Sequence, residues 1–230
     1  MKAIVLAGGL GTRLRERVAD LPKPMAPVAG RPFLEYVLDR LMRGGITDIV
    51  LSVGYMADAI VGHFGNSYRD AAIRYSREDE PLGTGGAIVH ALSGQGDEPY
   101  MILNGDTLLA IDYSELLRWY EREPVDIAMV LRAVADVSRY GAVLTSGDRV
   151  IGFTEKERAG AGLINAGVYI VRPALFDRYD LADKFSLEAD LLQPHCRSLA
   201  PKAYVTEGYF IDIGVPEDYD RAQHELPLVA

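Results

Sequence analysis

The chain of 230 residues has one cysteine, one tryptophan and no long hydrophobic run. Cys196 cannot form an internal disulfide, so the disulfide-stabilised miniproteins are excluded. No apolar stretch approaches the roughly 18 residues that a membrane-spanning helix needs. The apolar stretch at the N-terminus is too short for the core of a signal peptide. We therefore expect a folded, soluble protein of the cytoplasm.

Basic residues are also in short supply, since 24 Lys and Arg stand against 33 Asp and Glu, for a net charge of −9. This balance argues against nucleic-acid or anionic-membrane binding, because both favour a basic surface. The N-terminal segment is different, since residues 1–25 carry five cations against two anions. That local excess predicts a site for a small anionic molecule.

Apolar runs and amphipathic segments alternate along the first half of the chain. Buried strands are expected at residues 2–7, 47–53, 72–75 and 100–103, and helices at 32–43, 57–64, 84–92 and 113–122. After about residue 124 strand-like runs predominate, at 126–134, 142–145, 150–153 and 163–171, with helical segments at 174–176, 187–192 and 216–225. The alternation predicts an α/β fold with a mostly parallel sheet, helices on both faces and a β-richer second half.

A glycine-rich segment follows the first strand, Leu6-Ala-Gly-Gly-Leu-Gly-Thr-Arg-Leu14, with Pro22-Lys-Pro24 after it. Glycines after a parallel strand let backbone amides approach phosphate oxygens, and Arg13 and Lys23 add positive charge. The segment matches neither the dinucleotide fingerprint nor the Walker A loop. We interpret it as a phosphate cradle; the alternative is a glycine-rich turn with two exposed cations.

A second glycine-rich segment, Glu78-Asp-Glu-Pro-Leu-Gly-Thr-Gly-Gly-Ala87, stands at the entry to a predicted helix. Such a loop can lie along a nucleobase, with a carboxylate accepting from its N–H groups. Guanine fits a carboxylate best, because its N1–H and 2-amino group are parallel donors. The alternative is an acidic surface loop with glycine at the start of the helix.

Two aspartates suggest a metal site. Asp106 in Asn104-Gly-Asp-Thr107 ends a buried strand, where the ligands of open α/β sheets bind. Asp212 lies in the apolar segment Phe210-Ile-Asp-Ile-Gly214, a costly position for an unpaired charge. Mg²⁺ takes one or two protein carboxylates and leaves its other positions to phosphate and water. The alternative for Asp212 is a buried salt bridge to an arginine.

A fourth group of polar residues lies in the β-richer half, in Gly152-Phe-Thr-Glu-Lys156 and Asn165-Ala-Gly167. Glu155 and Asn165 are suited to holding sugar hydroxyls, and Lys156 to neutralising a phosphate. Surface turns explain the same residues nearly as well when each is taken singly. The four histidines share no metal-ligand spacing, and no Ser-His-Asp or Cys-His arrangement is evident.

In this order, and over residues 2 to about 223, these motifs resemble those of the sugar-1-phosphate nucleotidylyltransferases. Residues 21–36 and 210–219 are most similar to the D-glycero-D-manno-heptose 1-phosphate guanylyltransferases. The resemblance implies a Rossmann-like nucleotidyltransferase fold, in one domain over residues 1–230. Residues 1–124 would form its nucleotide-binding half and 125–230 its sugar-phosphate-binding half.

The resemblance also implies a reaction, in which GMP passes from GTP to a heptose 1-phosphate with Mg²⁺ as cofactor and pyrophosphate as by-product. Positioning and charge neutralisation lower the barrier, and no protein general base is required. The product would supply a capsule or other bacterial cell-surface polysaccharide. The resemblance leaves both a monomer and a homo-oligomer open. Alternatives are a mannose-1-phosphate guanylyltransferase, a uridylyltransferase for an amino-sugar 1-phosphate, and a regulatory subunit that only binds a nucleotide sugar.

By the same resemblance each motif residue has an expected role. The catalytic residues would be Arg13, Lys23 and Asp106, and the metal ligands Asp106 and Asp212. The nucleotide would contact Leu6, Gly8, Gly9, Gly11, Thr12, Arg13, Glu78, Gly83 and Thr84. The sugar phosphate would contact Asn104, Gly141, Glu155, Lys156, Asn165 and Gly167. Residues 15–20 depart from the family pattern, so no phosphate contact transfers to Arg15 or Arg17, and no hexapeptide repeat follows residue 214.

Overall fold

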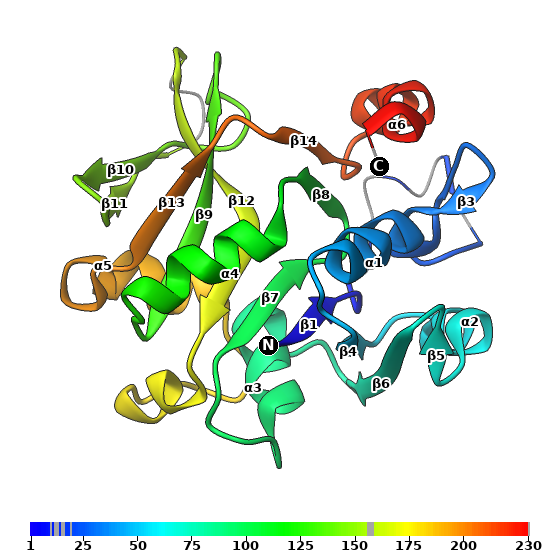
Figure 1. The fold of residues 1–230 in the computed structure, drawn as a ribbon, viewed down its shortest axis with the longest axis horizontal. Helices are drawn as coiled ribbons and strands as arrows, with labels where there is room; N and C mark the ends of the chain where they lie inside the picture. Colours follow the sequence, from blue (N-terminus) through cyan, green and yellow to red (C-terminus); the bar gives the residue numbers. More distant parts are fainter. Residues whose placement is uncertain (10, 12–13, 15–16, 19, 156–158, 230) are drawn as a thin grey trace. The chain divides into compact units, whose positions relative to one another are not determined.

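The computed structural model describes residues 1–229 except 10, 12, 13, 15, 16, 19 and 156–158 (Figure 1). The chain forms two compact units, which we call unit 1 and unit 2. Unit 1 comprises Met1–Pro81, Leu103–Ser114 and Tyr209–Ala230, and unit 2 comprises Leu82–Ile102 and Glu115–Gly208. These bounds differ from the predicted halves, because the chain leaves unit 1 after Pro81 and returns to it twice. That the two units act as a single domain stays a prediction.

Unit 1 is built on parallel strands that alternate with helices. Its main elements are β1 (Lys2–Leu6), α1 (Phe33–Arg43), β4 (Asp48–Val53), α2 (Ala57–Phe64), β5 (Ser67–Tyr68), β6 (Ala71–Arg77) and the end of β7 (Tyr100–Asn104). The strand order is β7-β1-β4-β6-β5, with β1–β4 and β4–β6 parallel and β5–β6 antiparallel. β1 and β4 are apolar because they are buried on both faces, as in other parallel sheets.

Short elements complete unit 1. They are the 3₁₀ turn η2 (Lys23–Met25), β2 (Pro27–Val28), β3 (Arg31–Pro32), β8 (Thr107–Ala110), β14 (Tyr209–Asp212) and α6 (Pro216–Val229). β2 pairs with β3, and β8 pairs with β14 across about a hundred residues of sequence. Strands of two to four residues have too few positions for a periodic pattern, so the sequence did not predict β2, β3 or β8.

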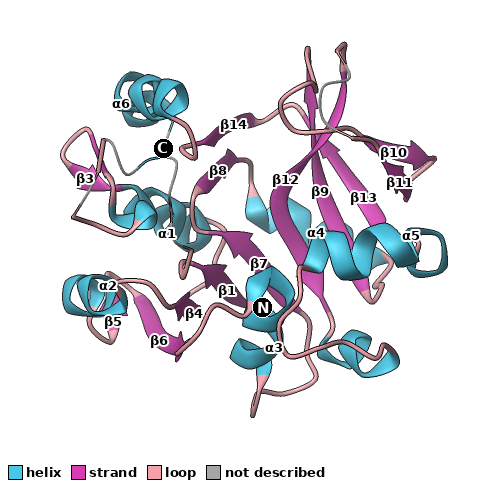
Figure 2. Ribbon diagram, turned by 180° about the vertical axis from the view of Figure 1, so that it is seen from behind, coloured by secondary structure: helices cyan, strands magenta, loops and turns pink. Residues whose placement is uncertain are grey.

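Unit 2 carries most of the later strands (Figure 2). Its elements are α3 (Gly83–Leu92), most of α4 (Tyr113–Arg122), β9 (Ile127–Val134), β10 (Val143–Ser146), β11 (Arg149–Phe153), β12 (Gly162–Val171), η3 (Pro173–Arg178), the π-helical turn η4 (Leu187–Leu192), α5 (Gln193–Leu199) and β13 (Lys202–Thr206). The strand order is β10-β11-β13-β9-β12-β7. β9 pairs antiparallel with β12 and parallel with β13. The α/β class and the β-richer second half are therefore confirmed.

Among the described residues, no helix is both long and apolar enough to cross a membrane.

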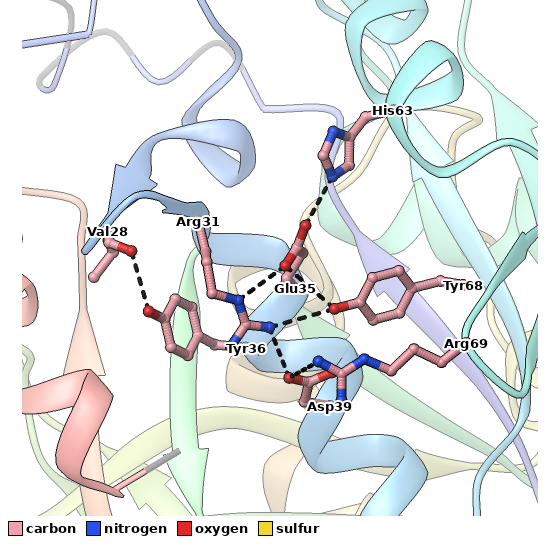
Figure 3. A network of polar contacts seen from close by, with 8 residues as sticks. All are labelled: Val28, Arg31, Glu35, Tyr36, Asp39, His63, Tyr68 and Arg69. Atoms are coloured by element: carbon pink, nitrogen blue, oxygen red, sulfur yellow. Dashed lines mark hydrogen bonds and ion pairs between the residues drawn. The ribbon is translucent and has the colours of Figure 1, made fainter.

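A charged network joins β3 to α1 in unit 1 (Figure 3). The Arg31 guanidinium donates from Nε to Glu35 Oε2 at 3.0 Å and from Nη2 to Asp39 Oδ2 at 2.7 Å. The Asp39 side chain is 6% exposed, and its Oδ2 also forms an ion pair with Arg69 Nη2 at 3.3 Å. Because β3 closes the hairpin that follows η2, the network fixes the segment that carries Lys23.

Glu35 is the junction of this network. Its Oε2 also accepts from the Tyr68 hydroxyl at 3.3 Å, and its Oε1 lies 2.9 Å from His63 Nε2. Burial is the largest single influence and raises the pKa of Glu35, but the hydrogen bonds from His63 and Arg31 and the Arg31 charge outweigh it. The net effect is a pKa below the ordinary value of 4.5.

A lowered carboxylate pKa makes a stability prediction with a definite sign. The stabilising contribution of ionised Glu35 is complete above pH 4.5 and is lost as the pH falls through the lowered native value. We expect Glu35→Gln to lower the free energy of unfolding by about 1–3 kcal/mol at pH 7. The gap from the parent chain should close as the pH falls below the native pKa.

Urea unfolding across this pH range measures the gap, with Glu121→Gln at an exposed position of α4 as the matched control. A gap that stays constant into the acid range would mean that Glu35 stabilises by packing rather than by its charge.

Candidate active site

The glycine-rich loop after β1 lies against Lys23. Gly11 has φ of +57°, and a Cβ there would stand only 2.9 Å from the Lys23 Cβ, so a side chain would collide with that residue. The start of the loop is held by the Ala7 amide, which donates to the Ser52 carbonyl at 2.8 Å. Leu6 ends β1 at this point. Thr12 and Arg13 lie outside the described residues.

The Lys23 ammonium lies between two carboxylates. Its Nζ is 2.6 Å from Asp106 Oδ2 and 3.5 Å from Asp212 Oδ1. The Lys23 side chain is 9% exposed, whereas those of Asp106 and Asp212 are 38% and 24% exposed. A buried ammonium needs such partners. Asp212 thus pairs with a lysine, rather than with the arginine that the alternative interpretation supposed.

Strand pairing brings the two aspartates together. In the β8–β14 ladder Asp212 stands opposite Thr107, and the Ile213 amide donates to the Asp106 carbonyl at 3.1 Å. Gly105 lets the turn before β8 pack closely, since a Cβ there would lie 2.7 Å from the Leu6 carbonyl oxygen. The pairing thus brings Asp106 and Asp212, which are far apart in the sequence, to the same ammonium of Lys23.

The donor set at this point fits a divalent cation of the magnesium type. Two carboxylates, Asp106 and Asp212, converge on a single positive charge, the Lys23 ammonium. No group of three or more His, Cys, Asp or Glu with metal-ligand placement occurs among the described residues. Mg²⁺ needs no such group, because phosphate and water complete its coordination.

The glutamate expected to read the base lies over the glycine loop. Glu78 follows β6, and its Oε1 would be 3.0 Å from a Cβ on Gly8. A side chain at position 8 would therefore shift the carboxylate. Ser52, fully buried in β4, donates from Oγ to the same oxygen at 2.9 Å. The sequence analysis missed Ser52, although a hydroxyl inside an otherwise apolar strand is the signal of a buried polar contact. Gly9 is exposed, with open space around it.

Gly83 and Thr84, the other nucleotide-contacting residues expected in the second glycine-rich segment, belong to unit 2. Gly83 has φ of +74°, and a Cβ there would lie 2.5 Å from the Phe185 carbonyl oxygen. The Thr84 hydroxyl donates to Glu188 Oε2 at 2.8 Å and accepts from the Leu187 amide at 2.9 Å. The side chain of Thr84 is therefore engaged within unit 2, which leaves its backbone as the group available to a nucleotide.

Asn165 belongs to a chain of hydrogen bonds that sequence reasoning missed. Its Nδ2 donates to the Tyr169 hydroxyl at 2.5 Å, and that hydroxyl donates to Glu188 Oε1 at 2.7 Å. Asn165 Oδ1 accepts from the Gly167 amide at 3.0 Å. Tyr169 is fully buried, and burial followed by the Glu188 charge raises the pKa of its hydroxyl well above the ordinary value. The hydroxyl stays protonated and bridges the amide and the carboxylate.

The remaining predicted sugar-phosphate residues are dispersed. Gly141 has φ of +79°, and its amide already donates to the Val137 carbonyl at 2.9 Å. Glu155 is exposed, and Lys156 lies outside the described residues. Asn104 ends β7 within unit 1, two residues before Asp106, whereas Asn165 belongs to unit 2. Unit 1 thus carries the cation and carboxylate group, and unit 2 the Asn165 group.

Comparison with known proteins shows the family of the chain. The sequence profile described as "Nucleotidyl transferase" matches residues 2–227. The chain belongs to the nucleotidyl transferase family. Among the relatives of this nucleotidyl transferase are D-glycero-alpha-D-manno-heptose 1-phosphate guanylyltransferases of Aneurinibacillus thermoaerophilus and Campylobacter jejuni. The first is 44% identical over 98% of both chains, and the second 43% identical over 95% of this chain and 97% of its own.

The fold of this nucleotidyl transferase is also that of a solved relative. The crystal structure of HddC from Yersinia pseudotuberculosis complexed with GMP-PN has a TM-score of 0.85 and 38% sequence identity, with 97% of this chain and 98% of that chain covered. The similarity spans both units.

The Tyr169 bridge allows a test of the expectation that Asn165 contacts the sugar phosphate. We expect Tyr169→Phe to raise KM for the sugar phosphate about tenfold, because losing one hydrogen bond to a charged group costs about 1.5–3 kcal/mol and removes one of the two hydrogen bonds that hold the Asn165 amide. KM for the nucleotide should change less than about twofold, and steady-state kinetics with each substrate varied in turn measures both.

The matched control is Tyr120→Phe, also in unit 2, which removes a hydroxyl that donates to the Val125 carbonyl at 2.8 Å. Equal changes in both KM values, or the same change in the control, would contradict a positioning role for Tyr169.

Proposed function

We propose that this nucleotidyl transferase transfers GMP from GTP to a D-glycero-D-manno-heptose 1-phosphate, giving GDP-heptose and pyrophosphate. The observation that carries the reaction class is the buried Lys23 ammonium, held beside the glycine loop by Asp106 and Asp212. The similarity to relatives named as heptose 1-phosphate guanylyltransferases supports the choice of substrates.

The proposed reaction is an in-line displacement. A phosphate oxygen of the sugar 1-phosphate forms a bond to the α-phosphorus of GTP, and the bond from that phosphorus to the β-phosphate bridging oxygen breaks. Pyrophosphate leaves with the electron pair of the broken bond. The attacking phosphate oxygen is already anionic, so no proton has to be removed from it. Both reactants are anions, and Lys23, joined by Arg13, supplies the positive charge that holds them together and offsets charge at the transition state.

Asp106 and Asp212 would hold Mg²⁺, and the ion would neutralise charge on the triphosphate when bound. In the structure the same carboxylates bind the Lys23 ammonium. A bound triphosphate would offer that ammonium new oxygen partners. The carboxylates would then be released from Lys23 to serve as ligands.

Guanine recognition is assigned to Glu78 and the loop at Gly8 and Gly9. The carboxylate of Glu78 can accept from two parallel N–H donors, a pattern that guanine presents and that uracil and thymine lack. Ser52 donates to its Oε1 at 2.9 Å and so helps to hold that oxygen in place. The solved relative bound to GMP-PN supports a guanine nucleotide.

The acceptor is assigned to Asn104, Gly141, Glu155, Lys156, Asn165 and Gly167. Our proposal includes a single functional domain, as a monomer or a homo-oligomer. It acts on small molecules rather than on nucleic acid or membrane. It places the reaction in the bacterial cytoplasm, where the activated heptose would feed a capsule or other cell-surface polysaccharide.

Substrate choice can be measured directly. Pyrophosphate release is followed with each nucleoside triphosphate and a panel of sugar 1-phosphates, for the parent chain and for Glu78→Gln. We expect release with GTP and the heptose 1-phosphate, and a GTP preference reduced by about tenfold or more in the variant, since a charged acceptor is lost.

Release with UTP or dTTP alone would rule out guanine recognition by Glu78. Faster turnover with mannose 1-phosphate than with the heptose would favour the mannose alternative.

The cation and carboxylate group makes a separate prediction. We expect Lys23→Ala and Asp106→Ala each to lower kcat by at least about a hundredfold, the usual effect of removing a preorganised electrostatic group. Circular dichroism and thermal unfolding check that the fold remains. Lys184→Ala, at an exposed position of unit 2, is the control for loss of a lysine. Near-normal turnover in either variant would refute the assigned role.

A further inference from the structure

The carboxylate of Glu188 connects residues from both predicted substrate groups. Its Oε2 accepts at 2.8 Å from the hydroxyl of Thr84, which we expect beside the nucleotide. Its Oε1 accepts at 2.7 Å from the hydroxyl of Tyr169, which holds the amide of Asn165, expected beside the sugar phosphate. All four residues belong to unit 2. A separate oxygen of one carboxylate therefore serves each group.

The Glu188 carboxylate is half-buried and is held by hydroxyl groups. Ser186 supplies a third one, which donates from Oγ to Oε2 at 3.2 Å. Within the part of the chain that the structure describes, no Lys, Arg or His lies within ion-pair distance of this carboxylate. Because protein donors occupy both of its oxygens, Glu188 is placed to hold other residues rather than to contact a substrate itself.

The contact at Oε2 fixes the backbone at the start of α3. The Thr84 hydroxyl also accepts from the Leu187 amide at 2.9 Å, and the Gly85 amide donates to the Phe185 carbonyl at 3.0 Å. A Cβ on Gly85 would overlap the Phe185 ring, so glycine permits this close packing. The Thr84 backbone, which is the part left for a nucleotide, thus takes its position from the segment that ends in Glu188.

The contact at Oε1 fixes the orientation of the Asn165 amide. Asn165 Nδ2 donates to the Tyr169 hydroxyl at 2.5 Å, and Asn165 Oδ1 accepts from the Gly167 amide at 3.0 Å. Because the Tyr169 hydroxyl gives its proton to Glu188, it can only accept from Asn165. The amide of Asn165 therefore presents its remaining hydrogen and lone pair in a fixed direction.

Glu188 lies in the π-helical turn η4, and such turns are rare and occur frequently at functional sites. The start of the turn is capped by other residues. Ser186 Oγ accepts from the Ala189 amide at 3.1 Å, and Asp190 Oδ2 accepts from the Ser186 amide at 2.7 Å. The turn thus has a capping carboxylate, Asp190, that is separate from the connecting carboxylate, Glu188.

We propose that Glu188 is a positioning residue for both substrates. It holds the backbone that contacts the nucleotide through Oε2, and the amide that contacts the sugar phosphate through Oε1. The inference rests on the proposed function and on the contacts expected of Thr84 and Asn165. Since each oxygen serves one substrate, variants that remove one contact or both have different expected effects on the two KM values.

Steady-state kinetics of the full chain, with GTP and the heptose 1-phosphate varied in turn, separates the two contacts. Glu188→Ala removes both and should raise KM for each substrate by about tenfold or more. Thr84→Val removes the contact at Oε2 and should raise KM for GTP alone. Tyr169→Phe removes the contact at Oε1 and should raise KM for the sugar phosphate alone. Thermal unfolding checks that each variant is folded.

Glu188→Gln is the conservative variant, and its expected effect is unequal. Thr84 and Ser186 both donate to Oε2, whereas Tyr169 alone donates to Oε1, so the single carbonyl oxygen of glutamine should take the place of Oε2. Its NH₂ group then faces Tyr169, whose proton loses its acceptor. We expect KM for the sugar phosphate to rise about tenfold and KM for GTP to change less than about twofold. A larger change for GTP would contradict the assignment of the two oxygens.

Asp190→Asn is the matched control, because it removes a carboxylate from the same turn that caps Ser186. It should leave both KM values within about twofold of the parent. Unchanged KM values in Glu188→Ala, or equal changes in Asp190→Asn, would overturn the proposal while the active parent chain still supports the proposed function. A parent chain that releases no pyrophosphate with these substrates contradicts the proposed function, and this inference with it.

Discussion

The Lys23 ammonium is the charge around which unit 1 is arranged. An ammonium whose side chain is only 9% exposed needs acceptors within the protein, and Asp106 and Asp212 supply them from two distant segments. Three features then become necessary: glycine at position 11 above the lysine stem, glycine at 214 beside its Nζ, and pairing of β8 with β14 to align the aspartates.

The same arrangement links the resting protein to the proposed reaction. A buried cation with two partly exposed carboxylates can exchange partners, because the carboxylates keep contact with water while the ammonium does not. Phosphate oxygens can satisfy Lys23, and the freed carboxylates suit a divalent ion. Unit 1 also holds Glu78 over Gly8, so the phosphate binding and base recognition that we propose would both depend on one glycine loop.

The sequence predicted those parts of the fold and site that depend on local chemistry. β1, β4, α1 and α2 were predicted within a residue or two, because long apolar patterns have a clear period. Asp106 was predicted from its place at the end of a buried strand, and Asp212 from the cost of a charge in an apolar strand. What escaped prediction depends on distant contacts: the two-residue strands, the return of the C-terminal segment to unit 1, and the Tyr169–Glu188 bridge. Neither Tyr169 nor Glu188 has a neighbour in sequence that marks its partner.

Charge pairing determines how the Lys23 group can meet a ligand. Lys23 is matched by carboxylates in the absence of ligand, so an incoming phosphate must displace them, and its binding is coupled to their release. A cation that exchanges partners in this way suits turnover, because the carboxylates take the ammonium back when the phosphate leaves.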